Sequence, residues 1–523
     1  MSTNEPEKMT AQQEVPFEGV TCECTADGTV PDYLPEIRRV LSVRAEAILG
    51  GQYTGQNRAE CAGSCRFTVI YADPEGKMAA VEATGDFECG VPLGGADPSA
   101  VSANWEAEAE TPVCRLGGPR KFSLRTTVCC RAQLWMPGPD SLLPPASEGD
   151  AIEALQKEMT AREVTPFTSD AIPLSGTERC DAAGEVQLLF CEGRVLLREC
   201  TPENGVLLCR GEVRVAVLCE PESGTAFPLT VRIPFEEAVA DLLPEEECRA
   251  VCRGYLTECT CTVSEDGTGE RSVTADVAMV LDGYRMRRAR IAPVTDLFSV
   301  HCPCHVQYSD CDVWENLGAT CNCFTLDGFA EREEGAEEAV SVADTYIAPA
   351  PVRLSASGST LTAEAEAKVQ MILLSAPDEE GRTIPFPVSF TAPLKMEVQL
   401  PTTIPADAQL TGHLTLTAPH GRLDRNRLFF DTEACLSVSV DTVRREQVAL
   451  HFTADCEHPF PTAGGGTVTA VYLQDNDTLW QVAKRYHTPT AAIAESNALP
   501  PEALQSPDET YTLDGYVKLL IEE

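Results

Sequence analysis

The sequence lacks long apolar runs and is poor in basic residues. Only 40 of its 523 residues are Lys or Arg, against 81 Asp or Glu, which leaves a formal net charge of −41. A surface of this sign repels phosphate groups, so the composition argues against nucleic acid and anionic membranes as partners and favours basic ones. A solvated acidic surface without a dedicated partner is the alternative interpretation.

Segments that would take the chain across a membrane are also missing. The first eight residues, MSTNEPEK, are polar and lack the apolar stretch of a secretory signal. No apolar run approaches the roughly 18 residues that a transmembrane helix needs. We therefore expect no transmembrane segment and a protein that stays in the compartment where it is made.

Sequence patterns that carry catalysis are absent as well. Gly464-Gly465-Gly466 is not followed by the Lys-Ser/Thr of a phosphate-binding loop. No Cys stands at a predicted helix N-terminus beside a His, and the chain has only seven His. We predict a non-enzymatic protein without a cofactor, with a metal-dependent or cysteine hydrolase as the remote alternative.

The chain does contain enough apolar residues for several cores. Its apolar fraction of 43% is ordinary for a globular protein. A single hydrophobic core stops growing at about 250–300 residues, so this length indicates about three or four domains.

Cysteine is abundant, with 24 residues, and part of it occurs as C-x-C. Residues i and i+2 of a strand face the same side, so each such pair indicates neighbours on one sheet face rather than a bridge. Without an export signal, we expect reduced thiols that behave as small hydrophobes. The C-x-C pairs are Cys22/Cys24, Cys259/Cys261, Cys302/Cys304 and Cys321/Cys323.

One cysteine-rich segment raises the question of zinc. His301-Cys302-Pro303-Cys304-His305 is followed by Cys311, Cys321 and Cys323. Structural zinc sites use C-x₂₋₄-C pairs, whose loop lets both sulfurs reach one ion, and C-P-C is shorter than that. We therefore predict cysteines on strands here and no metal ligands.

Three sequence markers recur at intervals of about 150 residues, which indicates a repeat. The first marker is Met9–Phe17, which returns as Met159–Phe167. The second is an apolar strand, an acidic turn and a strand that ends in Phe, and this Phe lies 16 residues after the end of the apolar strand. The third is an Arg that precedes an alternating strand. The second marker spans Tyr71–Phe87, Cys219–Phe235 and Leu374–Phe390, and the third begins at Arg120, Arg271 and Arg427.

Within each repeat the pattern is mostly that of strands. Segments such as Gly211–Leu218 and Ala434–Val440 alternate apolar and polar residues, and Pro, Asp, Glu and Gly mark the turns. We predict a mainly β fold of three tandem antiparallel β-sandwich-like repeats plus a small α+β domain. The predicted boundaries are 9–140, 150–290 and 295–455 for the repeats and 467–523 for the last domain.

Helices and connections complete the predicted body. Short helices are predicted over Tyr33–Val40 and Ala151–Met159. Linkers are predicted at 137–147 and 287–293, an acidic loop at 331–338, and a flexible tether at 459–466.

The last segment carries the densest signature of the chain. Asp477 or Thr478 can cap a helix in which Leu479, Val482, Ala483 and Tyr486 share one face. Thr490–Asn497 predicts a second helix that presents Ile493 on its apolar side, and Thr467–Leu473 and Tyr516–Ile521 predict flanking strands. The predicted order is strand, helix, helix, strand (βααβ).

This segment resembles a LysM domain, a small binding module without catalytic machinery. The resemblance rests on Asp477-Thr478-Leu479-Trp480 followed by Val482-Ala483 and Tyr486, and on Asn497 in the second helix. It implies a ligand groove between the loop after the first strand and the loop before the last. Asn476 stands where most members have Gly and adds a side chain there. The groove residues are Asp475, Asn476, Asp477, Thr478 and Leu479 on one side, and Asn497, Ala498, Leu499 and Pro500 on the other.

The whole arrangement resembles SipL-type spore coat morphogenetic proteins, in which SPOCS repeats precede one LysM domain. The early element Pro31–Leu41, the hairpin that ends in Phe and the Arg-led strand carry this resemblance with the LysM motif. It implies a non-enzymatic assembly protein of the mother cell, at the forespore surface, that binds a SpoIVA-type coat scaffold protein through LysM.

A second function remains open at this point. LysM domains usually bind N-acetylglucosamine-rich glycan, so a peptidoglycan-binding protein of the cortex or cell wall is the alternative. The missing export signal favours the protein partner, because wall glycan lies outside the cell. Three repeats would also offer several docking faces, which raises avidity without one tight site.

Overall fold

A computed structural model provides the structure of the chain. It describes residues 12–15, 19–55, 57–94, 97–137, 152–182, 184–222, 225–242, 248–265, 270–332, 337–348, 351–379, 382–417, 419–461, 468–474, 476–513 and 515–522.

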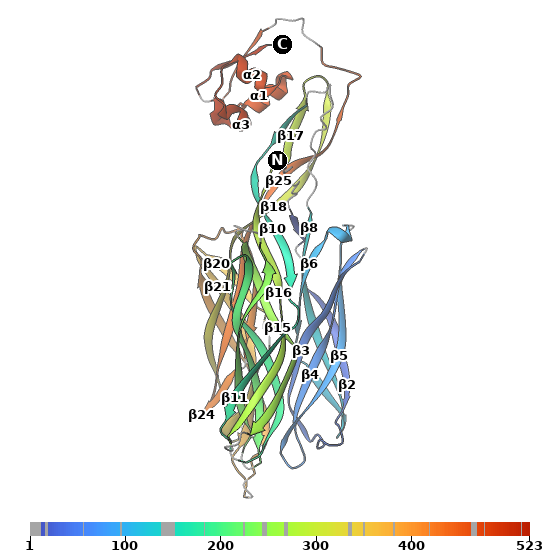
Figure 1. Ribbon diagram of the computed structural model, residues 1–523, viewed down its shortest axis with the longest axis vertical. Helices are drawn as coiled ribbons and strands as arrows, with labels where there is room; N and C mark the ends of the chain where they lie inside the picture. Colours follow the sequence, from blue (N-terminus) through green and yellow to red (C-terminus); the bar gives the residue numbers. More distant parts are fainter. Residues whose placement is uncertain are drawn as a thin grey trace.

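Antiparallel β-strands make up most of the described residues, and the α-helices are short and lie near the C-terminus. The strands of the body run along the long axis of the molecule, and the helices lie beyond one end of it (Figure 1). The predicted mainly β fold is confirmed. Among the described helices, none combines the length and apolar character needed to cross a bilayer.

The first pair of sheets shares one buried core. A five-stranded sheet is centred on β8, and a three-stranded sheet has the order β3-β4-β5. Their inner faces meet in a cluster that includes Phe67 and Phe87 from one sheet and Trp105 and Leu124 from the other. The strands are β1 Gln12–Val15, β2 Val20–Thr29, β3 Arg39–Thr54, β4 Arg58–Ala72, β5 Met78–Pro92, β6 Ser102–Ala109, β7 Val113–Gly118 and β8 Lys121–Pro137, with a 3₁₀ turn at Pro98–Ala100.

The second pair of sheets repeats this layout. β16 is the long central strand, with β10, β11 and β15 paired to it, and β12-β13-β14 forms the facing sheet. Val213 and Phe235 of one sheet pack with Leu256 and Met279 of the other. The strands are β10 Met159–Thr168, β11 Ile172–Cys180, β12 Val186–Glu203, β13 Val206–Pro221, β14 Phe227–Asp241, β15 Cys248–Glu265 and β16 Arg271–Ile291.

The third pair has the longest strands. β25 is central, flanked by β18, β23 and β24, and β21 is the centre of the facing sheet. Val369 and Phe386 pack against Phe430 and Leu436 between the two sheets. The strands are β18 Cys304–Glu331, β19 Ala339–Ala348, β20 Arg353–Ser357, β21 Thr360–Ser375, β22 Pro385–Gln399, β23 Gln409–Leu416, β24 His420–Asp424 and β25 Arg427–Ala454.

The three pairs of sheets also share a buried cluster, which we call the junction cluster. Leu41 and Ile70 of β3 and β4 meet Phe190 and Leu218 of β12 and β13 there, and Ile372 of β21 joins them. All five side chains are at least nine-tenths buried. The second and third markers lie at matching places in these sheets, because each hairpin contributes its Phe to a core and each Arg stands at the start of the long central strand.

The predicted helix over Tyr33–Val40 is wrong. A turn at 32–34 leads directly into β3 at Arg39. Arg120 donates to the carbonyls of Pro31 and Leu34, at 3.1 and 3.2 Å, and the Tyr71 hydroxyl donates to Pro35 O at 2.9 Å. These bonds to distant strands hold the segment extended against its local helix pattern.

The second helix prediction in the body is also wrong. Ala151 lies outside the described residues, and Ile152–Gln156 is strand β9, which pairs with β17 (Val294–Ser299). The linker predicted at 287–293 is largely strand, because β16 continues to Ile291. The other predicted linker lies outside the described residues except for Pro137, which ends β8, and residues 462–466 of the predicted tether lie outside them too.

One cysteine pair departs from the expectation of reduced thiols. Cys323 and Cys435 form a disulfide between β18 and β25. They are directly opposite in the antiparallel register, with Cα atoms 4.3 Å apart, a separation that brings two sulfurs within bonding reach. Cys304, Cys311, Cys321 and Cys323 all lie on β18, as predicted, whereas the prediction was wrong for Cys302, which lies in the bend before β18.

The C-terminal segment has the predicted strand–helix–helix–strand order. β26 (Val468–Tyr472) pairs with β27 (Lys518–Glu522), and α1 (Leu479–Tyr486) and α2 (Thr490–Ser496) lie between them in the chain. A short α3 (Glu502–Gln505) and a 3₁₀ turn (Thr510–Leu513) follow α2. We call residues 468–522 the C-terminal module.

Candidate functional site

The first predicted groove loop is largely occupied by bonds within the module. Thr478 caps α1, since its hydroxyl accepts from Gln481 N at 3.2 Å. Asp477 accepts from Gln474 N at 2.9 Å and from Arg485 at 3.2 Å. Leu479 is fully buried, whereas Asn476 is exposed. Asp475 lies outside the described residues.

The second predicted groove loop also contains both side chains that are bonded within the module and side chains that are exposed. Asn497 joins α2 to β27: its amide donates to Ile493 O at 2.8 Å and to Leu520 O at 2.7 Å, and its oxygen accepts from Leu520 N at 2.6 Å. Leu499 packs against the module core, and Ala498 and Pro500 are exposed. The loop side chains with an open surface are therefore Asn476, Ala498 and Pro500.

Helix α1 contacts the two-stranded sheet of β9 and β17. Asp296 of β17 accepts from Trp480 Nε1 at 2.8 Å, and both of its oxygens accept from Lys484 Nζ at 2.8 Å. Tyr308 of β18 donates to the same carboxylate at 2.6 Å. The ring of Phe298 meets Trp480 edge-on, with centroids 5.0 Å apart.

Further contacts hold the module in the same position. Thr490 of α2 donates to Glu153 of β9 at 2.9 Å, and Phe460 stacks on His487 with centroids 3.6 Å apart. Leu155 of β9 belongs to the module's own buried cluster. This docking surface was missed from the sequence, since Asp296 and Glu153 lie more than 180 residues before their partners and in no motif.

Exposed apolar side chains gather on the C-terminal module. Tyr472 and Val517 are 70% and 74% exposed, and Val468, Leu504 and Leu520 are exposed as well. Val468, Ala470 and Tyr472 alternate along β26 on its outer side, and Leu520 is opposite Ala470 on β27. The outer face of the two-stranded sheet therefore presents apolar Val468, Ala470, Tyr472 and Leu520, with Lys518 opposite Tyr472 and Glu522 opposite Val468 in the register.

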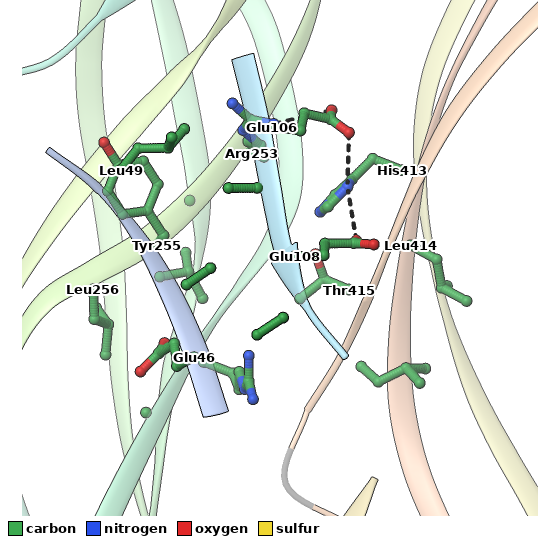
Figure 2. A pocket seen from close by; sticks show the side chains of 18 of the residues that line it. Glu46, Leu49, Glu106, Glu108, Arg253, Tyr255, Leu256, His413, Leu414 and Thr415 are labelled. Carbon is green, nitrogen blue, oxygen red and sulfur yellow. Dashed lines mark ion pairs between the residues drawn. The ribbon is translucent and has the colours of Figure 1, made fainter. Parts of the chain in front are cut away.

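A second candidate site is a cavity of about 120 Å³ where the three pairs of sheets meet. Figure 2 shows His413 of β23 between Glu106 and Glu108 of β6, with Arg253 of β15 beside Glu106. His413 Nδ1 lies 3.7 Å from Glu106 and 4.0 Å from Glu108, and it has no hydrogen-bond partner among the described residues. Burial lowers the pKa of His413, which the negative charge of Glu108 only partly opposes. The cavity therefore encloses an imidazole that lies between two carboxylates and whose charged form is disfavoured by burial.

Groups of cysteine thiols form a third feature of the interior. Cys22, Cys89 and Cys130 gather in the first pair of sheets, and Cys200, Cys209 and Cys252 gather in the second. Hydrogen bonding among the three thiols lowers the pKa of Cys209 and raises the pKa values of Cys200 and Cys252, so the thiolate is favoured on Cys209. Thiolate is the form in which cysteine binds metals and reacts as a nucleophile.

Comparisons of the chain with protein-family models, with curated proteins and with solved structures found no match.

Proposed function

We propose that the protein is a non-enzymatic assembly protein of the spore coat, which docks to a SpoIVA-type coat scaffold protein through its C-terminal module. In this proposal the module is a LysM domain at 467–523, and three tandem β-sandwich-like repeats at 9–140, 150–290 and 295–455 form the body. The mother-cell side of the forespore surface is the proposed location.

The observation that carries the proposal is the largely apolar outer face of the β26–β27 sheet on the module. Val468, Ala470, Tyr472 and Leu520 are exposed there beside the charged Lys518, and an exposed apolar patch with polar neighbours is typical of protein-interaction surfaces. Glycan binding depends in addition on several polar groups that converge at one site.

Hydrogen bonds within the predicted groove also support a protein partner rather than a glycan. The polar groups of Asp477, Thr478 and Asn497 are hydrogen-bonded to Arg485, Gln481 and Leu520 of the module itself. Among the described groove residues, open Asn476, Ala498 and Pro500 leave one polar side chain, that of Asn476, to contact a sugar. Peptidoglycan binding remains the second candidate function.

The test is a binding assay with the full-length chain, because Leu155 and Phe298 of the body complete the module core. Tyr472→Ser with Val468→Ser, which changes residues that are 70% and 55% exposed, should weaken binding to purified scaffold protein about tenfold or more, as removal of interface anchors does. The matched control is Tyr53→Ser with Val113→Ser, which changes equally exposed residues of the body (67% and 58%) and should bind as the wild type does.

A third variant addresses the predicted groove. Asn476→Arg with Pro500→Glu places two charges on the exposed loops and should weaken binding only if the groove itself contacts the partner. Retention on purified peptidoglycan without any binding to the scaffold protein would contradict the proposal and favour the glycan.

A further inference from the structure

Three cysteine sulfurs meet between the β12–β13 hairpin and strand β15. Cys209 Sγ lies 3.2 Å from Cys200 Sγ and 3.7 Å from Cys252 Sγ, and the three lie within 4.8 Å of one another. Cys200 and Cys209 are directly opposite in the hairpin, whereas Cys252 comes from the facing sheet. Packing of the two sheets therefore brings the third sulfur to the pair.

The spacing of these sulfurs suits a single thiophilic ion. Zinc–sulfur bonds of about 2.3 Å place two thiolates about 3.8 Å apart in a tetrahedral site and about 4.0 Å apart in a trigonal one. The Cys209–Cys252 distance lies close to these values, whereas Cys200 Sγ is about 0.6 Å closer to Cys209 Sγ than a tetrahedral site requires. Side-chain adjustments of about 0.5–1 Å would complete the geometry, since the third pair of sulfurs lies within 4.8 Å.

Solvent can reach this group of thiols through a cavity. Cys200 and Cys252 line a space of about 240 Å³, and Cys248 and Cys321 line it as well. Cys321 comes from β18 of the third pair of sheets, and its thiol donates to Leu197 O at 3.1 Å. The cavity offers an entry route and a fourth ligand position, for a water molecule or for another thiol.

We propose that Cys200, Cys209 and Cys252 bind one thiophilic d¹⁰ cation, Zn²⁺ or Cu⁺. Each thiol that coordinates releases its proton to solvent, so binding acidifies an unbuffered solution. Three thiolates around Zn²⁺ leave a charge of −1, and around Cu⁺ they leave −2. Arg198 and Arg249 line the same cavity and oppose this charge, which is smaller with Zn²⁺, whereas Glu199 adds one negative charge to the lining.

A disulfide is the competing use of the same residues. Cys200 and Cys209 have the cross-strand arrangement of Cys323 and Cys435, which are bridged. Two cysteines suffice for a disulfide, whereas the convergence of Cys252 from another sheet is what a metal site requires. Oxidation of Cys200 with Cys209 would leave one thiol and abolish binding.

The test is metal binding by the full-length protein, reduced with a phosphine and stripped of metal. Titration with Zn²⁺, and separately with Cu⁺ under anaerobic conditions, should give a stoichiometry about one ion per chain lower in Cys209→Ala and Cys252→Ala than in wild type. The number of bound ions is compared with that of wild type because Cys22, Cys89 and Cys130 form a second group of thiols, whose bound ions the titration would also count. The matched control is Cys219→Ala, since Cys219 is equally buried on β13 but outside the group, and it should keep the wild-type stoichiometry.

A spectroscopic readout complements the count of ions. Co²⁺ in place of Zn²⁺ should produce the near-ultraviolet charge-transfer absorption of thiolate ligands, and Cys209→Ala should lower it while Cys219→Ala does not. Equal stoichiometry for both metals in wild type and in both triad variants overturns the proposal. So does a Cys200–Cys209 disulfide in protein isolated with its thiols blocked by alkylation.

Discussion

Buried arginines connect residues from different sheets. Arg44 of β3 pairs with Glu192 of β12 at 3.0 Å and with Asp344 of β19, and its side chain is 6% exposed. Its guanidinium lies over the rings of Phe190 and Tyr346 at 4.6 and 4.7 Å. Each of the three pairs of sheets therefore contributes to the environment of this one charge.

Removal of Arg44 should strongly destabilise the protein. In Arg44→Met, Glu192 keeps Arg194, but Asp344 loses its ion-pair partner in a site where burial already raises its pKa. An uncompensated buried charge costs about 3–5 kcal/mol, so the free energy of unfolding from urea titration should fall by about that much.

The control for this prediction is an exposed ion pair. Arg58 is 57% exposed and lies 3.7 Å from Glu60, so Arg58→Met should change the free energy of unfolding by no more than about 1 kcal/mol. Equal losses in the two variants would show that the junction between the sheets does not depend on the Arg44 charge.

The buried His413 predicts a pH dependence of stability. Burial lowers its pKa below the ordinary value of 6.5, against the effect of Glu108 and with that of Arg253 and Arg131. The unfolded chain takes up the proton first as the pH falls, so stability decreases from about pH 6.5 downwards, by up to about 1.4 kcal/mol per pH unit.

This contribution should disappear when His413 is replaced. His413→Gln should show a shallower loss of stability than wild type between pH 6.5 and 5, measured by urea titration at each pH. His420→Gln, which changes an exposed residue (68%), should keep the wild-type slope. A wild-type slope in His413→Gln would mean that the imidazole is not the group that titrates.

Among the structural elements, α1 depends on a single carboxylate of the body. Burial raises the pKa of Asp296, but hydrogen bonds from Lys484, Trp480 and Tyr308 outweigh this effect and lower it. The ionised form is therefore the one that holds the helix. Its contribution is present above the ordinary Asp pKa of about 3.9 and is lost as the pH falls below that value.

Asp296→Asn should loosen this docking at neutral pH. Hydrogen bonds to a charged group contribute about 1.5–3 kcal/mol, so amide hydrogen exchange in residues 479–486 should accelerate about tenfold or more. Asp312→Asn is the control, because Asp312 pairs with the exposed Arg445 far from α1. Unchanged exchange in Asp296→Asn would assign the docking to the apolar contacts of Phe298 alone.

Much of this element structure could be predicted where local pattern and tertiary packing agree. The hairpins that carry Phe87, Phe235 and Phe390 and the helix capped by Thr478 follow from periodicity and capping. The predicted strand ends were wrong, because each second strand continues beyond its Phe. The helix prediction over Tyr33–Val40 was wrong because Arg120 and Tyr71, which are distant in sequence, bind backbone carbonyls in and next to this segment. Contacts such as Asp296 with Lys484 leave no local signal, since each residue alone is an ordinary surface charge.

In the whole molecule, β18 and β25 link the body to the C-terminal module. Each has 28 residues, which corresponds to about 90 Å of strand at about 3.3 Å per residue. Their outer ends pack with β9 and β17 around Val294, Leu297 and Ala449, on the side of the body that faces the module (Figure 1). The two-stranded β9–β17 sheet and the outer ends of β18 and β25 thus support the module together.

The junction cluster implies that the body folds cooperatively. A chain that ends at residue 292 would keep the strands of the first two pairs of sheets but would lose Ala343, Ile372 and Leu374 from the cluster. It would also lose Asp344 from Arg44 and Asp441 from Arg162. Exposed apolar surface and unpaired buried charge together destabilise a fold and promote aggregation. We expect the truncated chain to be aggregated, or cleaved by a protease far faster than the same residues of the full chain.

Calorimetry of the full chain should correspondingly show the body unfolding in one transition. A truncated chain that stays monomeric and melts at the full-length temperature would show that each pair of sheets is stable alone, with the junction only a contact between independent units.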